Sequence, residues 1–542
     1  MAFSTFISDR YGVHYQHIRT SLDARSYSFV LRSTSPPKLR LEIKRGKITV
    51  LYAAYHSWKG DIHIDIWRCH ERYGIVMPQS PVMTIVNERS GKYVRYRPNA
   101  IVFNTAAALH DIYRRPGIFA KSKGYSCMVH RAPNTFTILG GRDHARRRRI
   151  LAQGLSEKAL RDYEPRILEH ISKFCKVLGA DASQVAWSQP KDMSCWCNYL
   201  SFDIMSDVVF GAKYDLLCSE TYRYICEAIE VSNVRMSFLV HAGRWAVPFI
   251  EKSTFRRAIR ARNRFVAFVA RVVGDRLKRQ SLNVAGKMPI KPDIFSHLQN
   301  AKDPQTGDGF NQEEVGAEGT TLIVAGSDTT STSICTVLFY LAHNPVIHAR
   351  VTAEVRSSFE RHSDICIGPR LASCTYLRAC IDEAHRMSPA VGNSLFREVL
   401  EDGAVIDGHF IPAGCDVGVG IYSIHHSEDY FRDPFVYRPE RWLLSETGIT
   451  PEEVERGISV LNPFSLGLRG CLGKALATAE LQLSVASIVH MYDFRLPVDK
   501  HGRVGEGHPS GEYGRHRSHE YQLYDHITSQ KQGPFLQFRV RD

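Results

Sequence analysis

The sequence predicts an α+β protein that is predominantly α-helical, and three observations carry this prediction. Apolar residues recur at helical spacing from about 142 to 360, with breaks near Gly211, near Pro248 and over the polar stretch 301–310. Alternating side chains over 92–113 predict a β-hairpin followed by a helix. Short strand-like runs separated by Gly, Asp and Pro turns extend from about 394 to 420. Small sheets are therefore expected before and after a large helical body.

The composition describes a globular protein and excludes several classes. The 542 residues are 44% hydrophobic and 23% charged, which is enough apolar material for a sizeable core. The 13 cysteines are scattered without zinc-ligand spacing, which argues against a disulfide framework and for a reducing compartment. The net charge of +14 is densest at 146–149, four consecutive arginines. Aromatic residues do not alternate with the basic ones, so we expect an acidic protein partner or a membrane surface and no nucleic acid.

The N-terminal segment 1–60 is predicted to be irregular. Charged residues interrupt each of its short apolar runs, so it contains neither a run of transmembrane length nor the apolar core of a signal peptide. Its middle holds SPPKLR, where two consecutive prolines predict a stiff turn.

One long helix is predicted between Asn311 and His343. Asn311 and Glu314 form a capping-box pattern, and an Asn-Pro pair stops the apolar pattern after His343. At about 1.5 Å per residue, such a helix crosses a whole domain. Its middle reads AGSDTTSTS, where Gly326 costs about 1 kcal/mol relative to Ala. A solvated, hydroxyl-rich face is the alternative, but the flanking LIV and VLFYL segments predict a buried helix that makes room for a ligand.

Cys471 lies among three glycines in FSLGLRGCLGKALA, directly before a predicted helix. Four interpretations compete: a buried structural thiol, a disulfide partner, a nucleophile and a metal ligand. The scatter of cysteines disfavours the disulfide, whereas a nucleophile needs a nearby base and stays open. Gly467, Gly470 and Gly473 are expected to let backbone amides approach the sulfur, and the helix N-terminus favours a thiolate. A single soft ligand without partner ligands indicates a metal held mainly by another group, such as a porphyrin.

Four segments resemble motifs of the cytochrome P450 family, and they follow one another along the chain in the order that the family has. AGSDTT at 325–330 is similar to the family's oxygen-activating helix, and EAHR at 383–386 is similar to its Glu-x-x-Arg helix. FVYRPERW at 435–442 is similar to the segment that carries a second arginine. The loop Phe464-x-x-Gly467-x-Arg469-x-Cys471-x-Gly473 is similar to the haem-binding loop. The resemblance covers most of 92–542. It implies the cytochrome P450 fold, with small β regions and a long central helix, and a single catalytic domain over 61–542.

The resemblance implies haem b, iron protoporphyrin IX, as the cofactor, with the thiolate of Cys471 as axial iron ligand. Phe464 would shield the thiolate. Arg469 and Arg397 would pair with haem propionates, since a fixed cation stabilises a partly buried carboxylate. Arg148 resembles the arginine of the family's helix C.

His144, four residues before Arg148, stands where many family members carry Trp. The other arginines of the RRRR run are expected to face solvent or a redox partner. Asp328 and Thr329 are the implied catalytic pair, a carboxylate and a hydroxyl that would handle the protons the reaction consumes. Gly326 would leave space above the iron.

Two further groups of residues follow from the resemblance. Glu383, Arg386 and Arg441 would form a buried charge network that holds the scaffold of the haem loop. The pocket for a hydrophobic substrate would be lined around 125–136, 231–249 and 391–395.

The function implied is that of a monooxygenase that inserts one oxygen atom from O2 into a small hydrophobic substrate. A looser similarity points to fungal secondary metabolism, to an NADPH-cytochrome reductase as electron donor and to the cytosolic face of the endoplasmic reticulum membrane. A haem-thiolate isomerase or dehydratase, and a haem-binding protein without turnover, are the alternatives. Asp328 and Thr329 argue against the isomerase, which needs no external protons.

Two departures from the family pattern concern the N-terminal part of the chain. The hydrophobic anchor expected by family is not readable in 1–60, although SPPKLR resembles the hinge that follows such an anchor. Residues 75–91 separate motifs that normally adjoin, so they are interpreted as an insertion or a translated piece of intron.

Overall fold

Helices dominate the part of the chain that the computed structural model describes, namely residues 50–72, 91–129, 132–243, 248–284, 293–444, 446 and 448–541. All of these lie in one unit, Gly46–Asp542. The predicted insertion lies outside the described residues except for Gly91, as does the predicted irregular segment up to residue 49. In the rest of that segment the prediction is wrong, because Leu51–Lys59 form a helix that ends at Gly60 in the left-handed region.

The helical prediction for 142–360 is confirmed. The helices in chain order are α3 (Leu51–Lys59), α4 (Ile62–Arg72), α5 (Ala106–Arg114), α6 (Gly141–Gly154), α7 (Glu157–Leu178), α8 (Met193–Phe210), α9 (Tyr224–Ala242), α10 (Pro248–Thr254), α11 (Arg256–Val284), α12 (Ile294–Asn300), α13 (Gln312–His343), α14 (Pro345–Ser358), α15 (Pro369–Ala372), α16 (Thr375–Met387), α17 (Ile421–His425), α18 (Pro451–Val460) and α19 (Lys474–Met491). Gly211 ends α8 in the left-handed region, α10 begins at Pro248 after α9 has ended at Ala242, and 301–310 separate α12 from α13, so all three predicted breaks are present.

The strands are short. They are β1 (Tyr93–Arg97), β2 (Ala100–Phe103), β3 (Phe119–Lys121), β4 (Lys191–Asp192), β5 (Arg397–Val399), β6 (Ala404–Ile406), β7 (His409–Ile411), β8 (Asp416–Val419), β9 (Tyr492–Arg495), β10 (Tyr524–His526), β11 (Thr528–Gln530) and β12 (Phe535–Val540). β4, β12 and β9 form one sheet, while β6–β7 and β10–β11 are separate pairs.

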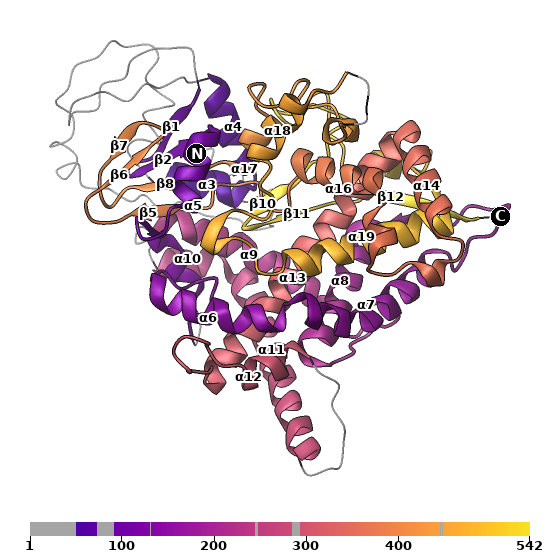
Figure 1. Ribbon diagram of the computed structural model, residues 1–542, viewed down its shortest axis with the longest axis horizontal. Helices are drawn as coiled ribbons and strands as arrows, with labels where there is room; N and C mark the ends of the chain where they lie inside the picture. Colours follow the sequence, from indigo (N-terminus) through magenta and orange to yellow (C-terminus); the bar gives the residue numbers. More distant parts are fainter. Residues whose placement is uncertain are drawn as a thin grey trace. The chain divides into compact units, whose positions relative to one another are not determined.

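The main sheet joins two segments that the sequence placed apart. Its order is β1-β2-β8-β5-β3, with β2 parallel to β8 and the other neighbours antiparallel. The hairpin predicted before the helical body therefore shares a sheet with β5 and β8, two of the strands predicted after it, whereas β6 and β7 pair with each other in a separate sheet. Figure 1 shows β1, β2, β5 and β8 on the side of the molecule away from α7 and α14.

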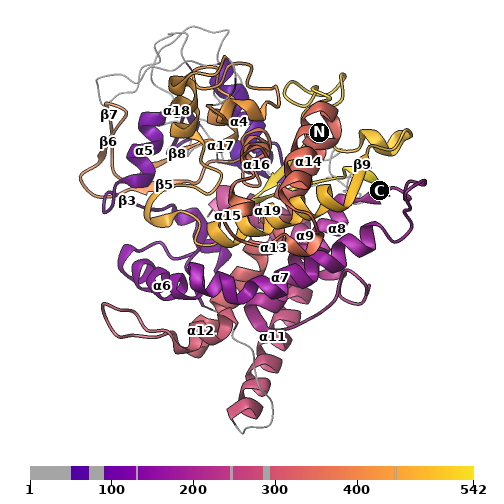
Figure 2. The same ribbon diagram turned by 45° about the vertical axis from the view of Figure 1, so that its right-hand side comes forward.

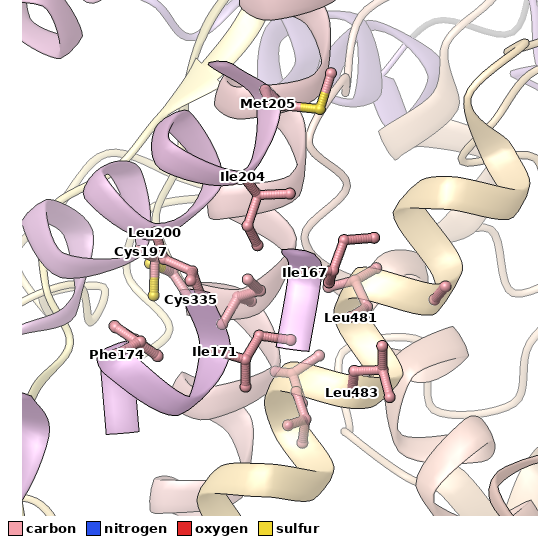
Figure 3. Close-up of a cluster of buried hydrophobic side chains, with 14 of the residues drawn as sticks. Ile167, Ile171, Phe174, Cys197, Leu200, Ile204, Met205, Cys335, Leu481 and Leu483 are labelled. Atoms are coloured by element: carbon pink, nitrogen blue, oxygen red, sulfur yellow. The ribbon is translucent and has the colours of Figure 1, made fainter. Parts of the chain in front are cut away.

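The core is built around α13. Its capping box at Asn311 and Glu314 is present as predicted, and Asn344 caps its C-terminus. α8, α16 and α19 pack against it (Figure 2). Side chains of α7, α8, α13 and α19 meet in the apolar core of Figure 3, among them Ile171, Leu200 and Leu483. Among the described residues, α13 alone is long and apolar enough to cross a membrane, with a mean hydropathy of 1.3, but 72% of that stretch is buried within the protein.

The buried carboxyl of Glu480 in α19 leads to the first prediction. Neither of its oxygens has a hydrogen-bond partner among the described residues, and burial raises its pKa from 4.5 to about 8. Between these values the folded protein keeps a proton that the unfolded chain releases, so the free energy of unfolding falls as the pH rises from about 4.5 to about 8. The Glu480→Gln variant should lose this slope and be more stable at pH 8, by on the order of a few kcal/mol. Urea unfolding across this pH range measures it.

The exposed Glu455 of α18 offers the control. Glu455→Gln should keep the slope of the native protein. An unchanged slope in Glu480→Gln would contradict the assignment.

Candidate active site

The loop that carries Cys471 is anchored by a buried charge network. The Glu383 carboxylate accepts hydrogen bonds from Arg386 at 2.8 and 2.9 Å and from Arg441 at 2.9 Å, so the predicted contacts are present. Burial alone would raise the pKa of Glu383, but the two guanidinium groups outweigh it and hold the pKa below its usual value. Arg386 also donates to the carbonyl of His425 at 2.8 Å, and the backbone N–H of Asn462 donates to His425 Nε2 at 3.1 Å. This chain of bonds reaches the first residue of the cysteine loop.

The loop folds back on itself so that Cys471 precedes α19. The backbone N–H of Cys471 donates to the Phe464 carbonyl at 2.8 Å, and that of Gly470 donates to Gly467 at 3.0 Å. Gly467 has φ +68°, and a Cβ there would lie 2.0 Å from the carbonyl oxygen of Tyr113. Its absence of a side chain therefore serves a close approach to α5. Of the three glycines expected to let backbone amides approach the sulfur, Gly473 supplies a backbone hydrogen bond to it.

The pKa of the Cys471 thiol is raised, because burial outweighs the groups that favour its anion. Burial raises its pKa, while a hydrogen bond from the Gly473 backbone and the charges of Arg148 and Lys474 lower it. Neither cation is a base that could accept the thiol proton at neutral pH, which weakens the nucleophile interpretation. All 13 cysteines lie in the described ranges and all are free thiols. The described residues contain no group of three or more His, Cys, Asp or Glu that could hold a metal, so a metal at Cys471 needs a non-protein group.

A cluster of buried cations lies near this loop. Lys121 and Arg397 stand directly opposite each other on β3 and β5, with exposed fractions of only 7% and 5%. Arg469 of the cysteine loop acts electrostatically on both. Burial and these neighbours lower the pKa of Lys121 well below its ordinary value, and burial and Arg397 lower that of Arg469 to about 10. Like charges paired across strands destabilise a sheet.

The chemistry of the cation cluster fits a dianionic ligand. No carboxylate among the described residues shifts the pKa of Lys121 or Arg469, so the described part of the chain supplies no counter-charge to either of them. Carboxylates placed among these cations would relieve their repulsion and form charge-assisted hydrogen bonds. The two propionates of the predicted haem are such groups. The sequence analysis did not identify Lys121 as a site residue, although the sequence FAKSK places a lysine in a short strand.

The remaining predicted residues of the cluster are held by backbone carbonyls. Arg469 donates to the carbonyls of Ile138 and Leu139, both at 2.7 Å, and Arg148 to that of Gly470 at 2.7 Å. His144 is buried near them, and its pKa falls to about 3 through burial and the surrounding cations, which keeps the ring neutral.

Among the other arginines of the RRRR run, Arg147 does not face solvent as predicted, whereas Arg146 and Arg149 are partly exposed. Arg147 is buried and donates to Glu314 at 2.8 Å. Arg146 donates to the same carboxylate at 3.0 Å. Arg149 pairs with Asp303. These arginines tie α6 to α13 and to the loop before it, because a buried guanidinium needs a paired carboxylate.

A cavity of about 960 Å³ lies against α13. All three predicted segments contribute to its wall, for example through Phe136, Met236 and Leu395. Sequence reasoning missed the contribution of α11, which supplies an apolar face to the same wall. α9 and α11 pack against each other, and both contribute to this wall.

The centre of α13 presents a threonine and an alanine to this cavity. Thr329 lines the cavity, and its hydroxyl donates to the Ala325 carbonyl at 2.7 Å. Ala325 also lines it. Gly326 does not leave space in the cavity as expected. A Cβ there would lie 2.5 Å from Met205 Cε, so this glycine serves the close packing of α8 against α13.

Asp328 points away from the cavity into a polar pocket beside β11. Its carboxylate accepts hydrogen bonds from Thr528 and, at 3.2 Å, from Asn233, and both of these partners line the cavity. Burial raises the pKa of Asp328, and the nearby Lys531 ammonium and the Thr528 hydroxyl counteract this in part. The structure thus brings Asp328 and the cavity into contact through side chains that sequence reasoning missed.

Lys531 is a fully buried cation that joins Asp328 to a second acid. Its ammonium donates to Asn198 at 2.8 Å and to Ser331 at 3.0 Å, while Asn198 donates to Glu230 at 2.8 Å. Burial lowers the pKa of Lys531, but Cys335, Glu230 and Asp328 outweigh it, so the pKa is raised and the charge is kept. No short motif marks Lys531, because it lies 200 residues from Ser331 and 333 residues from Asn198 in the chain.

Comparisons with known proteins identify this arrangement. Residues 81–507 match the family described as Cytochrome P450. Among curated proteins, the chain is 40% identical to cytochrome P450 monooxygenase AKT7 of Alternaria alternata, over 91% of each chain. It is 43% identical to cytochrome P450 monooxygenase poxM of Penicillium oxalicum, covering 92% of this chain and 89% of that one.

Solved structures agree on the fold. A crystal structure of a cytochrome P450, CYP102L1, matches with a TM-score of 0.63 at 21% identity, covering 82% of this chain and 89% of that one. The haem domain of cytochrome P450DA matches with the same TM-score at 18% identity, over 82% and 88%. A cysteine-ligated haem iron is the family's cofactor. The chain therefore belongs to the cytochrome P450 family and is a haem-thiolate monooxygenase, which uses O2, an organic substrate and electrons from a redox partner.

Proposed function

We propose that Cys471 is the axial ligand of the haem iron and that Arg148, Arg397, Arg469 and Lys121 bind its carboxylates. The observation that carries this assignment is the buried cross-strand pair Lys121 and Arg397, which has Arg469 beside it and no carboxylate to neutralise it. When bound, the haem supplies the oxidising chemistry that transfers one oxygen atom from O2 to the substrate. Phe464, whose ring contacts His385 edge-on at 5.6 Å, would shield the thiolate.

Asp328 and Thr329 are proposed to move the protons that the reaction consumes. Thr329 Oγ1 lies on the cavity wall, where it can hold a proton next to the substrate. Asp328 Oδ2 reaches the same wall through Asn233 and Thr528 and would return protons to it from the far side of α13. Lys531 is a positioning residue that favours the ionised form of Asp328.

The substrate is proposed to be a small hydrophobic molecule of a fungal secondary-metabolite pathway. The apolar wall of the cavity and the fungal sources of the relatives support this. The electron donor is proposed to be an NADPH-cytochrome reductase, and the net charge of +14 suits an acidic partner. Attachment to the cytosolic face of the endoplasmic reticulum membrane is proposed from the family resemblance.

The Cys471→Ser variant tests the axial ligand. Reduced protein treated with carbon monoxide should show the Soret band of a thiolate-ligated haem, and the variant should lose it because a serine oxygen cannot replace the thiolate. The exposed Cys366 gives the control, and Cys366→Ser should keep the band. An unchanged band in Cys471→Ser would contradict the assignment.

The Lys121→Met variant tests the cation cluster. Removing one cation relieves repulsion, so the haem-free protein should become more stable to urea. The same variant should lose haem to an excess of apomyoglobin faster than native protein, by roughly 10- to 100-fold, because a hydrogen bond to a charged group is lost. Lys123→Met, two residues away at an exposed site paired with Glu398, should change neither quantity. Equal haem loss in both variants would remove Lys121 from the haem site.

The proton route is tested by Thr329→Ala and Lys531→Met. Thr329→Ala should release peroxide in place of product at every pH.

Lys531→Met should raise the pKa of Asp328 further, because only its hydrogen bonds and the acids Glu230 and Cys226 remain nearby. The acidic limb of the turnover profile should therefore move to higher pH by about one unit or more.

Two comparisons separate this effect from a loss of structure. The carbon-monoxide spectrum reports whether Lys531→Met still holds haem, and the exposed Lys500→Met serves as a charge-matched control. Combining Lys531→Met with Asp328→Asn should add nothing to the effect of Asp328→Asn alone. Additive effects would show that Lys531 does not act through Asp328.

A further inference from the structure

The cavity adjoins a second, basic pocket of about 720 Å³ on the outer side of α9 and α11. Arg262 lines both of them. The outer pocket is otherwise lined by Arg235, Lys252, Arg256, Ile259, Arg260 and Asn263. A ligand that occupies the cavity and reaches this boundary therefore meets a guanidinium group there.

Arg262 is half-buried, and among the described residues its guanidinium Nε lacks the partner that a buried donor usually has. Its Nε is buried and forms no hydrogen bond within the described part of the chain. The nearest acid is Glu251, which already pairs with Nε of Arg235. Burial and Arg235 lower the pKa of Arg262, and Glu251 raises it only in part. Two guanidinium groups share one carboxylate, so the boundary carries an excess of one positive charge before the outer basic residues are counted.

A purely structural role does not account for this arrangement. A buried donor without an acceptor destabilises a protein, and natural sequences keep such groups where a ligand satisfies them. A methionine or leucine at 262 would fill the same wall of α11 without the unpaired charge. The guanidinium group is therefore suited to an anion that arrives from the cavity, and its planar fork matches a carboxylate.

The cavity beyond Arg262 is apolar along α11. Phe265, Val269 and Val273 follow Arg262 at spacings of three to four residues, and all line the cavity. Thr329 lies on the opposite wall of the same cavity. A ligand that fits both ends has one anionic group and an apolar body, and its apolar part lies where the oxygen atom is inserted.

We propose that the substrate is an amphipathic carboxylic acid, whose carboxylate is bound by Arg262 and whose hydrocarbon part extends along α11 towards Thr329. This proposal rests on the proposed function of the same cavity and specifies its substrate class. A carboxylate both accepts a hydrogen bond from Arg262 Nε and pairs with its charge, whereas a neutral molecule of the same shape leaves that charge unpaired. Specificity thus comes from the cost of leaving this charge unpaired.

Binding to the haem-loaded protein tests the proposal without any turnover. Calorimetric titrations with dodecanoic acid and with its methyl ester compare two probes of the same hydrocarbon length. Native protein should bind the acid roughly 10- to 100-fold more tightly than the ester, as expected for a hydrogen bond to a charged group. Arg262→Met should lower the affinity for the acid by the same factor and change the affinity for the ester by less than about twofold.

The control is Arg260→Met, which removes an exposed arginine that lines the outer pocket but not the cavity. It should leave both affinities unchanged. Equal affinities of native protein for acid and ester, equal losses in Arg262→Met, or binding of neither probe would each overturn the proposal. The carbon-monoxide spectrum of the same samples reports on Cys471 separately, so failure of the haem assignment is distinguishable from failure of the substrate class.

Discussion

The carboxylate of Glu383, buried with two arginines around it, sets the geometry of the proximal half of the site. Arg386 holds it from the same helix, Arg441 holds it from a distant segment, and the Arg386 fork continues to the carbonyl of His425. Each member needs the others, because removing one would leave a buried charge uncompensated. Through His425 this network reaches Asn462, and the loop that ends at Cys471 starts from a fixed point.

The cation cluster is the opposite case, because its charges have no paired carboxylate among the described residues. There, Lys121 and Arg397 are buried beside the partly exposed Arg469, and no acid among the described residues shifts the pKa of Lys121 or Arg469, so the protein alone holds them at a cost in free energy. A dianionic group that binds there would relieve the repulsion between the cations, and this relief would add to its affinity. The repulsion is a form of preorganisation, because the donors stand in place before the ligand arrives.

At the cavity, one turn of α13 carries two side chains that lie in different environments. Thr329 faces the cavity, while Asp328 faces a closed polar pocket with Lys531 and Thr528. Adjacent residues on a helix point in different directions, so proton handling and substrate contact occupy neighbouring positions without competing for space. At the boundary of the cavity, Arg262 Nε has no hydrogen-bond acceptor among the described residues, and a bound organic anion would supply one.

The sequence by itself determined the local features of this protein. The capping box of α13, the cysteine loop before α19, the Glu383 network and the family followed from short motifs, because each depends on residues close together in the chain or on a strict spacing. Tertiary structure decided what those motifs meet. It placed the hairpin of 93–103 in one sheet with 397–419, set Lys121 against Arg397, turned Gly326 towards Met205 and buried Arg147. Lys531 and Arg262 carry no sequence signature, since their meaning lies in which charges are left unpaired when distant segments pack, and only the folded chain determines that.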